Sequence, residues 1–248
     1  MHQNNEVSQP EVLETYSLQA SGKVHLDLLV LRYMAQRIHV HLLNLPTNTL
    51  LPSVEYAEEH HNRIHRIVIY KQQEFLPQRN LMFVGFISGI QEQVNLATIQ
   101  EIHRVDKILV AELANNPGLL SYSSLELRKG CWYNLVLLSD FTAKTYFKNY
   151  STHRYASHQL AGHYYTWIRL HNGVMPGGLP GGGEASGVGE GRGEASRVGA
   201  SPTRTFNGMI LQSTKYYAFP GVGQKPVMRE LFYDDVIDGV TCSSSVFS

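Results

Sequence analysis

The sequence predicts an α+β fold in which two helices cover one face of an antiparallel sheet. Three observations carry this prediction. The run LMFVGFISGI at 81–90 is apolar at both alternating positions, as expected of a strand that is buried on both faces. Apolar residues then recur every three or four positions, as on a helix, until the turn NNPG at 115–118. Two more strand-like runs follow, separated only by RKG, which is the spacing of a hairpin.

The predicted elements follow one another in the order βαββαβ. Asn95 is suited to cap the first helix, whose apolar positions are Ile99, Ile102, Val105, Leu109 and Leu113. LLSYSSLEL at 119–127 and CWYNLVLLSD at 131–140 form the expected hairpin. SHQLAGHYYTWIRLHNG at 157–173 is expected to form the second helix, and TFNGMILQSTKYYAF at 205–219 the last strand. This order is that of a ferredoxin-like unit.

The hairpin also bears on assembly. In its second strand Leu135 and Leu137 point to one side, while Trp132, Val136 and Leu138 point to the other. Because the two helices of such a unit cover only one face of the sheet, the other face needs a second cover. Either the N-terminal third supplies it, or a second copy does, which would close two sheets into a dimeric barrel.

The rest of the chain divides around this expected domain at 80–219. Residues 1–79 form an N-terminal extension in which 23–33, 37–45 and 66–70 could be strands and 55–65 a short helix, as in a degenerate first ferredoxin-like repeat; a helix over 26–43 fits almost as well. Residues 176–204 are rich in glycine and carry a near-repeat, GEASGVG and GEASRVG, so we expect a disordered insertion there. Residues 220–248 are expected to be a tail.

Composition excludes several classes of protein. Lys and Arg together number 21, as do Asp and Glu, so no excess charge favours nucleic acid or an anionic membrane as a partner. No apolar run approaches the length needed to cross a bilayer, and the only cysteines, Cys131 and Cys242, offer no disulfide framework. We therefore expect a cytoplasmic protein. Its twelve histidines supply imidazoles for chemistry without showing that any is used.

With these features the chain resembles the dimeric α+β barrel superfamily, whose best-known branch is the antibiotic biosynthesis monooxygenase-like proteins. The resemblance covers about residues 80–219 and rests on the βαββαβ order, the Pro117–Gly118 turn before LLSYSSLEL, the CWYNLVLLSD strand and the histidine-rich second helix. It implies a homodimer and a small-molecule protein, among them cofactor-independent oxygenases acting on aromatic substrates, haem-binding enzymes and members without known activity. The long N-terminal third, the insertion and the tail depart from the family's compact domain.

The predicted second helix carries the main candidate site. Its apolar stripe would comprise Leu160, Tyr164, Trp167, Ile168 and His171, with His163 at the edge. His171 and His163 are the candidate catalytic residues, since a neutral imidazole on an apolar face can act as a base. An apolar or aromatic ligand would lie between this helix and the sheet, lined by Tyr164, Trp167, Tyr122, Trp132 and Asn134, with His153 at the mouth. The alternative is an aromatic core that contains one hydrogen-bonded histidine.

The sequence gives less support for a cofactor, a metal site or a phosphate loop than for the site around His171. No cofactor is required by the sequence; haem would need an axial histidine, for which His153, His163 and His171 are the candidates. His39 with His41, and His61 with His65 and Glu58, could pair around a metal, but HHNRIH lacks the glutamate of the HExxH pattern, so no metal site is predicted. FPGVGQK at 219–225 opens no helix and is not a phosphate loop. The function expected is therefore a monooxygenase-like enzyme or ligand-binding protein, with a non-catalytic dimeric interaction module as the alternative.

Overall fold

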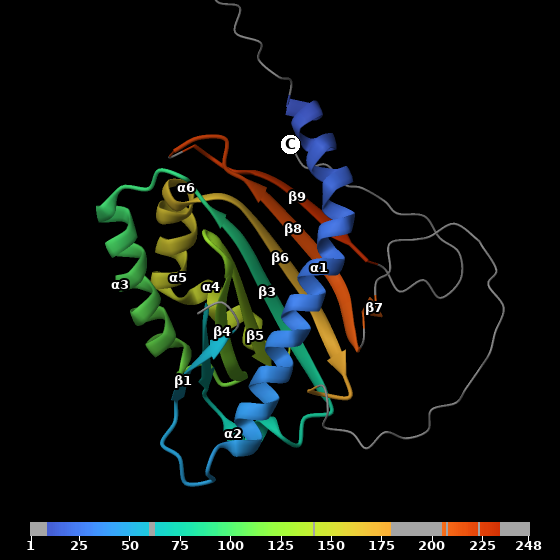
Figure 1. Cartoon of the computed structure of the whole chain (residues 1–248), viewed down its shortest axis with the longest axis vertical. Coiled ribbons are helices and arrows are strands. Elements are labelled where there is room, and N and C mark those ends of the chain that lie inside the picture. Colours follow the sequence, from blue (N-terminus) through green and yellow to red (C-terminus); the bar gives the residue numbers. More distant parts are fainter. Residues whose placement is uncertain are drawn as a thin grey trace, which may run out of the picture.

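The computed structural model describes residues 9–59, 63–140, 142–179, 205–206, 208–222 and 224–233. They form an α+β fold with one antiparallel sheet of nine strands (Figure 1). The strands are β1 (Ser53–Glu59), β2 (Arg63–Ile69), β3 (Asn80–Ile90), β4 (Leu119–Arg128), β5 (Cys131–Leu138), β6 (Tyr165–Pro176), β7 (Thr205–Phe206), β8 (Met209–Ala218) and β9 (Val227–Phe232). The helices are α1 (Gln9–Asn44), α2 (Gln72–Phe75), α3 (Leu96–Leu113), α4 (Thr142–Asn149), α5 (Ser151–Tyr155), the π-helical turn η1 (Ala156–Leu160) and α6 (Ala161–Tyr164).

The strands lie side by side in the order β1-β2-β4-β5-β3-β6-β8-β7, and β9 also pairs with β8. The middle of the sheet, β4-β5-β3-β6, is built from the segment β3-α3-β4-β5-α4–α6-β6. Three elements expected there are confirmed. Strand β3 and the β4–β5 hairpin fall where the apolar runs place them, and α3 begins after Asn95, whose side chain accepts a hydrogen bond from the Thr98 amide at 2.8 Å.

The predicted second helix is wrong over most of its length. Helical structure ends at Tyr164, and β6 then runs from Tyr165 to Pro176 and pairs with β3 and β8. Because both faces of β6 are covered, its side chains are buried at both parities, and that pattern imitated a helical stripe. The strand expected at 205–219 exists as β7 and β8, but it extends the sheet beyond β6 instead of completing the unit.

The N-terminal third also differs from the strand interpretation. Residues 23–33 and 37–45 are not strands, because α1 runs through both up to Asn44, which is the helical alternative. The segment expected as a short helix at 55–65 instead supplies part of β1 and the start of β2, and the strand expected at 66–70 is the rest of β2. Part of the expected tail is a strand, β9. The glycine-rich insertion falls outside the described residues from position 180 to 204.

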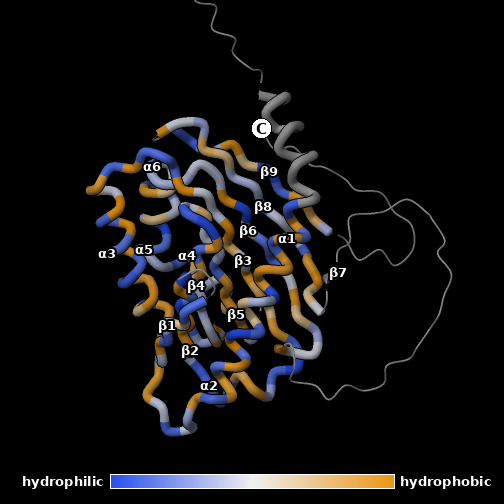
Figure 2. The backbone as a smooth tube through the Cα atoms, in the orientation of Figure 1, coloured by the Kyte–Doolittle hydropathy of each residue, from blue (hydrophilic) through white to orange (hydrophobic). Residues whose placement is uncertain are grey.

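Helices cover both faces of the sheet. On one face α3 and α4 pack over a cluster that includes Val68, Met82, Leu113 and Leu138. On the other face α1 crosses the strands (Figure 1), and its inward residues Leu28, Leu31, Met34, Ile38 and Leu42 are fully buried in the larger cluster. Hydrophobic residues recur along α1 and along the strands behind it (Figure 2). Of the two covers expected for this face, the N-terminal third is the one observed.

A glycine allows α1 to approach the sheet closely. A Cβ atom at Gly85 of β3 would lie 2.4 Å from Cδ1 of Leu31 in α1, nearer than real carbon contacts allow. No helix in the described part of the chain combines the length and apolarity that crossing a membrane requires.

Candidate functional site

A buried polar network joins α1 to the sheet, and it contains His171. Asp27 lies on the inward face of α1 and is fully buried. Arg169 and His171 lie two positions apart on one side of β6, Tyr133 lies on β5 and Thr214 on β8. Alternation along each strand directs all four side chains toward α1, where they surround the carboxylate.

The Asp27 carboxylate accepts four hydrogen bonds. Its Oδ2 atom accepts from Arg169 Nε at 2.6 Å and lies 2.9 Å from His171 Nε2, and its Oδ1 atom accepts from Arg169 Nη2 at 2.7 Å and Tyr133 Oη at 3.0 Å. Burial raises the pKa of Asp27, but the hydrogen bonds from His171 and Arg169 and the charge of Arg169 outweigh it, so the pKa lies below its ordinary value. The carboxylate is therefore ionised at neutral pH.

The ionised carboxylate fixes one proton of His171. Because Asp27 can only accept, His171 Nε2 carries the proton and donates it. The Nδ1 atom forms the second hydrogen bond of the ring, with Thr214 Oγ1 at 2.8 Å. Tyr233 Oη in turn donates to Thr214 Oγ1 at 3.4 Å. Both ring nitrogens of His171 are thus bonded to protein atoms.

The order hydroxyl, imidazole, carboxylate is the one that activates a nucleophile in hydrolases. Chemistry would require a substrate carbon beside Thr214 Oγ1, but Thr214, His171 and Asp27 each have 0% exposed surface. What the arrangement does in this structure is to tie α1 to β5, β6 and β8. Trp167 packs on the Arg169 guanidinium, whose carbon lies 4.3 Å from the ring centroid, and so shields the ion pair.

The residues expected to line one pocket lie on opposite faces of the sheet. Trp167 and His171 lie on the α1 side. Tyr122 lies on the α3 side, where its hydroxyl donates to Asn134 Oδ1 at 2.9 Å. Trp132 alternates with the buried Tyr133 and points to the same side as Asn134.

The remaining candidates lie on the helical segment before β6. Tyr164, in α6, is buried, whereas His163 beside it is exposed. His153 lies in α5, where burial and then nearby His158 lower its pKa, and its ring lies 6.5 Å from that of Phe147. The hydrogen bonds around His171 run instead to Asp27 and Thr214, so these three side chains lie outside the network.

The histidines expected to pair around a metal in the N-terminal third do not form a site in the structure. His41 lies on α1 and contacts Glu55, and His65 lies on β2, fully buried, with Nδ1 3.4 Å from Glu59 Oε1. His39 is buried on α1, Glu58 is exposed on β1, and His61 falls outside the described residues. Within the part of the chain that the structure describes, no three histidine, cysteine or acidic side chains converge as metal ligands.

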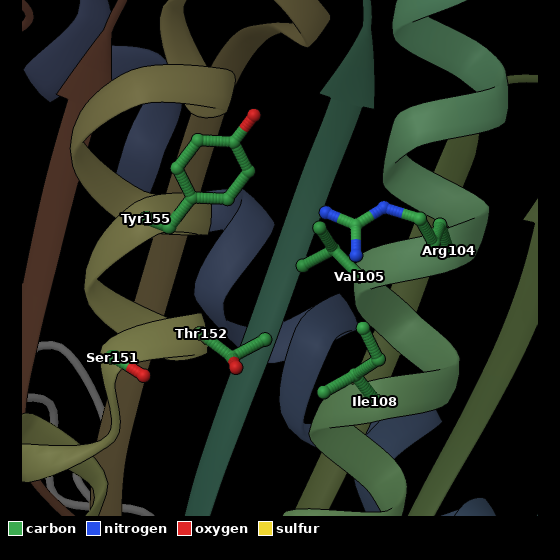
Figure 3. A pocket seen from close by; sticks show the side chains of 6 residues that line it. All are labelled: Arg104, Val105, Ile108, Ser151, Thr152 and Tyr155. Carbon is green, nitrogen blue, oxygen red and sulfur yellow. The ribbon is translucent and has the colours of Figure 1, made fainter.

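A hollow of about 280 Å³ lies between α3 and α5. Arg104, Val105 and Ile108 face Ser151, Thr152 and Tyr155 across it (Figure 3). The Arg104 guanidinium is held by Glu101 through bonds of 2.8 and 2.7 Å, and Thr152 Oγ1 donates to Glu112 at 2.8 Å. Both of these polar groups are therefore already bonded to neighbouring side chains.

The outer face of α1, opposite the network, is apolar as well. Five large apolar side chains lie on it with substantial exposure: Leu26 (49%), Leu29 (49%), Tyr33 (38%), Val40 (49%) and Leu43 (64%). They are spaced so that they fall on one side of the helix, away from the buried residues of the inward face. A surface helix normally carries charged and polar residues on this side, so α1 is built as if both of its faces were covered.

Asp27, Arg169, Thr214 and Tyr133 were missed as site residues. One signal was available, because Asp27 is the only acidic residue between Lys23 and Arg32 and interrupts an apolar run. The Arg169 and Thr214 contacts depend on the register of β6 and β8, which local pattern does not define. In comparisons with known proteins, no family model, curated protein or solved structure matches the chain.

Proposed function

We propose that the chain is a non-catalytic interaction module that binds protein through the outer face of α1, defined by Leu26, Leu29, Tyr33, Val40 and Leu43. The observation that carries the proposal is the apolar outer face on a helix whose inner face is already buried by the sheet. The buried network supports it, because the ion pair and the His171 bonds hold α1 in place and thereby present a fixed surface.

The surroundings of the histidines favour the interaction module over a catalytic function. His171, Asp27 and Thr214 each have 0% exposed surface, so a substrate has no access to the imidazole or to the hydroxyl beside it. His163 is exposed at the end of α6, without a described acidic or hydroxyl partner to orient it. Haem at His171 is disfavoured as well, because an axial ligand needs a free ring nitrogen and both nitrogens of His171 are hydrogen-bonded within the protein.

We also infer that the segment from β3 to β6 is a ferredoxin-like unit. The support is its strand order β4-β5-β3-β6 with α3 and α4–α6 as the two connections. In a dimeric barrel of such units the uncovered sheet faces meet, but α1 already occupies that face here. For this reason the interface that we propose is the outside of α1 and not the sheet.

A photoreactive amino acid tests the proposed surface, and the partner need not be identified in advance. Introduced in place of Tyr33 in cells that express the protein, it should give discrete protein adducts on illumination, and the double variant L29E/V40E should lose them. Tyr56, an exposed tyrosine on β1, provides the matched control position and should give none. Absence of adducts at position 33, or equal adducts at position 56, contradicts the proposal.

A second candidate retains small-molecule binding, at a place other than the expected pocket. The hollow between α3 and α5 is a shallow, open depression of about 280 Å³, slightly smaller than usual ligand pockets of about 300–1,000 Å³. Addition of small aromatic and anionic compounds should shift the NMR signals of Thr152 and Tyr155 and leave those of β1 unchanged. Unperturbed spectra across such a set remove this candidate.

A further inference from the structure

We infer that the partner of the outer face of α1 is a second copy of the same chain, bound so that the two α1 helices lie antiparallel. This inference rests on the proposed function and names its partner. The spacing of the face supports it. Residues 26, 29, 33, 36, 40 and 43 follow one another at intervals of three, four, three, four and three, which is the repeat of a helix that packs against another helix. Only Gln36 in this series is polar.

The exposed area is of the size that a paired interface requires. From their exposed fractions, the five apolar side chains present on the order of 400–500 Å² in one patch, at the upper end for ordinary monomers. Two such patches together bury about 1,000 Å² before any polar rim is counted, close to the lower limit of specific interfaces. A second copy supplies a matching apolar surface of equal length.

The chain's own remaining segments fit the face less well. Residues 180–204 contain only two large aliphatic side chains, Val188 and Val198, set among glycines and charged residues. The tail from 234 has three aspartates within its first five positions. The insertion has no apolar residues at a spacing that would fill the grooves along α1, and the apolar residues of the tail, Val236, Ile237 and Val240, lie among or near these aspartates.

The spacing of the face is the same in both chain directions, which allows a twofold antiparallel pair. In that pair Leu26 of one copy meets Leu43 of the other, Leu29 meets Val40, and Tyr33 meets Gln36. The Tyr33 hydroxyl already donates to Glu59, and its oxygen can still accept a hydrogen bond from the Gln36 amide of the other copy. The one polar residue of the series then lies beside a polar group.

A parallel pair is less favourable at the same positions. In a parallel pair Gln36 of one copy would face Gln36 of the other, and Tyr33 would face Tyr33, in separate layers. It would also bring Arg32 of one copy toward Arg37 of the other, since residues five positions apart flank a parallel seam. The Arg37 side chain is 35% exposed, and the contact would bring two like charges together, which the ion pair of Arg37 with Glu59 offsets only in part.

Measurement of mass in solution tests the second copy as partner. The wild-type chain should elute and scatter light at twice its 27.9 kDa mass, and L29E/V40E should give the single-chain mass with an unchanged circular dichroism spectrum. The matched control V54E/Y56E places the same two charges on exposed residues of β1 and should remain dimeric. A monomeric wild-type chain, or a dimer that survives L29E/V40E, overturns the inference.

Disulfide trapping tests the orientation. In a background with Cys242 changed to serine, and with Cys131 buried, L29C/V40C should form a covalent dimer under mild oxidation while L29C alone should not. In the antiparallel pair the two copies of position 29 are about 16 Å apart along the axis, beyond the roughly 7 Å reach of a disulfide. Rapid cross-linking of L29C alone indicates a parallel pair and overturns the antiparallel arrangement.

The two proposals can fail separately. Adducts at position 33 that contain other proteins, together with a monomeric chain, would leave α1 as a binding face and remove the second copy as its partner. A dimer that resists L29E/V40E, with no adducts at position 33, would remove both.

Discussion

Substitution of Asp27 by asparagine should be among the most destabilising conservative changes in the chain. The amide would keep the shape of the side chain but lose its charge, leaving the Arg169 guanidinium buried, with 10% of its side chain exposed, and uncompensated. Removing one partner of a buried ion pair costs about 3–5 kcal/mol. That is a large share of the roughly 5–15 kcal/mol by which a folded domain is more stable than its unfolded state.

Asp106 provides a matched control for this change. It forms the same two-bond pair with Arg66, at 2.6 and 2.9 Å, but the side chains are 34% and 19% exposed. Because solvent screens such a pair, D106N should cost about 0–1 kcal/mol. Urea unfolding followed by circular dichroism gives both free energies of unfolding, and hydrogen exchange should show α1 protection falling in D27N alone. A loss in D27N no larger than that in D106N would refute the structural role assigned to the network.

Three further predictions concern single buried groups. Burial lowers the pKa of His65 below 6.5 despite nearby Glu59, so the contribution of His65 to the free energy of unfolding should be constant above about pH 6.5 and fall as the pH drops below it, because the unfolded chain then binds the extra proton. H65F should reduce that slope in urea titrations, and an unchanged slope would count against this role of His65. T214V leaves Nδ1 of His171 buried without its hydrogen-bond partner and should cost about 1–3 kcal/mol in the same assay, and T214S should recover most of this loss. Equal losses in both variants would contradict the bond. In G89A the added Cβ would lie 2.3 Å from Trp167 Nε1, so the melting temperature should fall by the equivalent of about 1–3 kcal/mol. An unchanged melting temperature would show that the Trp167 ring moves aside freely.

Local signals were sufficient for the middle of the fold. The N-cap at Asn95, the three-and-four spacing through Leu113 and the turn at Gly118 each act within a few residues, and α3 and the hairpin form where those signals place them. A hairpin needs little more than its own sequence, because its two strands are adjacent in the chain. These elements could therefore be predicted without knowledge of the rest of the molecule.

Local signals fail at strand β6. In the segment from Tyr165 to Pro176, Trp167, Arg169 and His171 point toward α1, and the residues between them point toward α3. Neither face of this strand is open to solvent along its middle. A strand covered on both sides has no polar face, so its sequence lacks the two-residue period that identifies strands in half-exposed sheets. What decides its conformation is pairing with β3 and β8, and those contacts link residues far apart in sequence.

The expected pocket was assembled on a helix that ends at Tyr164, so Trp167 and His171 lie on β6 instead. His171 was correctly singled out as a buried imidazole, and the alternative of a hydrogen-bonded core describes its environment better than the pocket does. Its partners could not be predicted, because Asp27 lies 144 residues away in the chain. Only the isolated charge of Asp27 within an apolar run could have marked it as a buried ion-pair residue.

The two apolar faces of α1 explain why its sequence resembles strands, and they bear on the proposed interface. A helix with one apolar face shows a clear three-and-four period, but apolar residues on opposite faces fill the gaps in that period. The inward set, from Leu28 to Leu42, is covered by the sheet. The outward set, from Leu26 to Leu43, has no cover among the described residues. The apolar outward set thus both hid the helical period in the sequence and calls for a partner in the structure. If L29E/V40E changed neither the mass in solution nor the adducts, the outward set would have no role in binding.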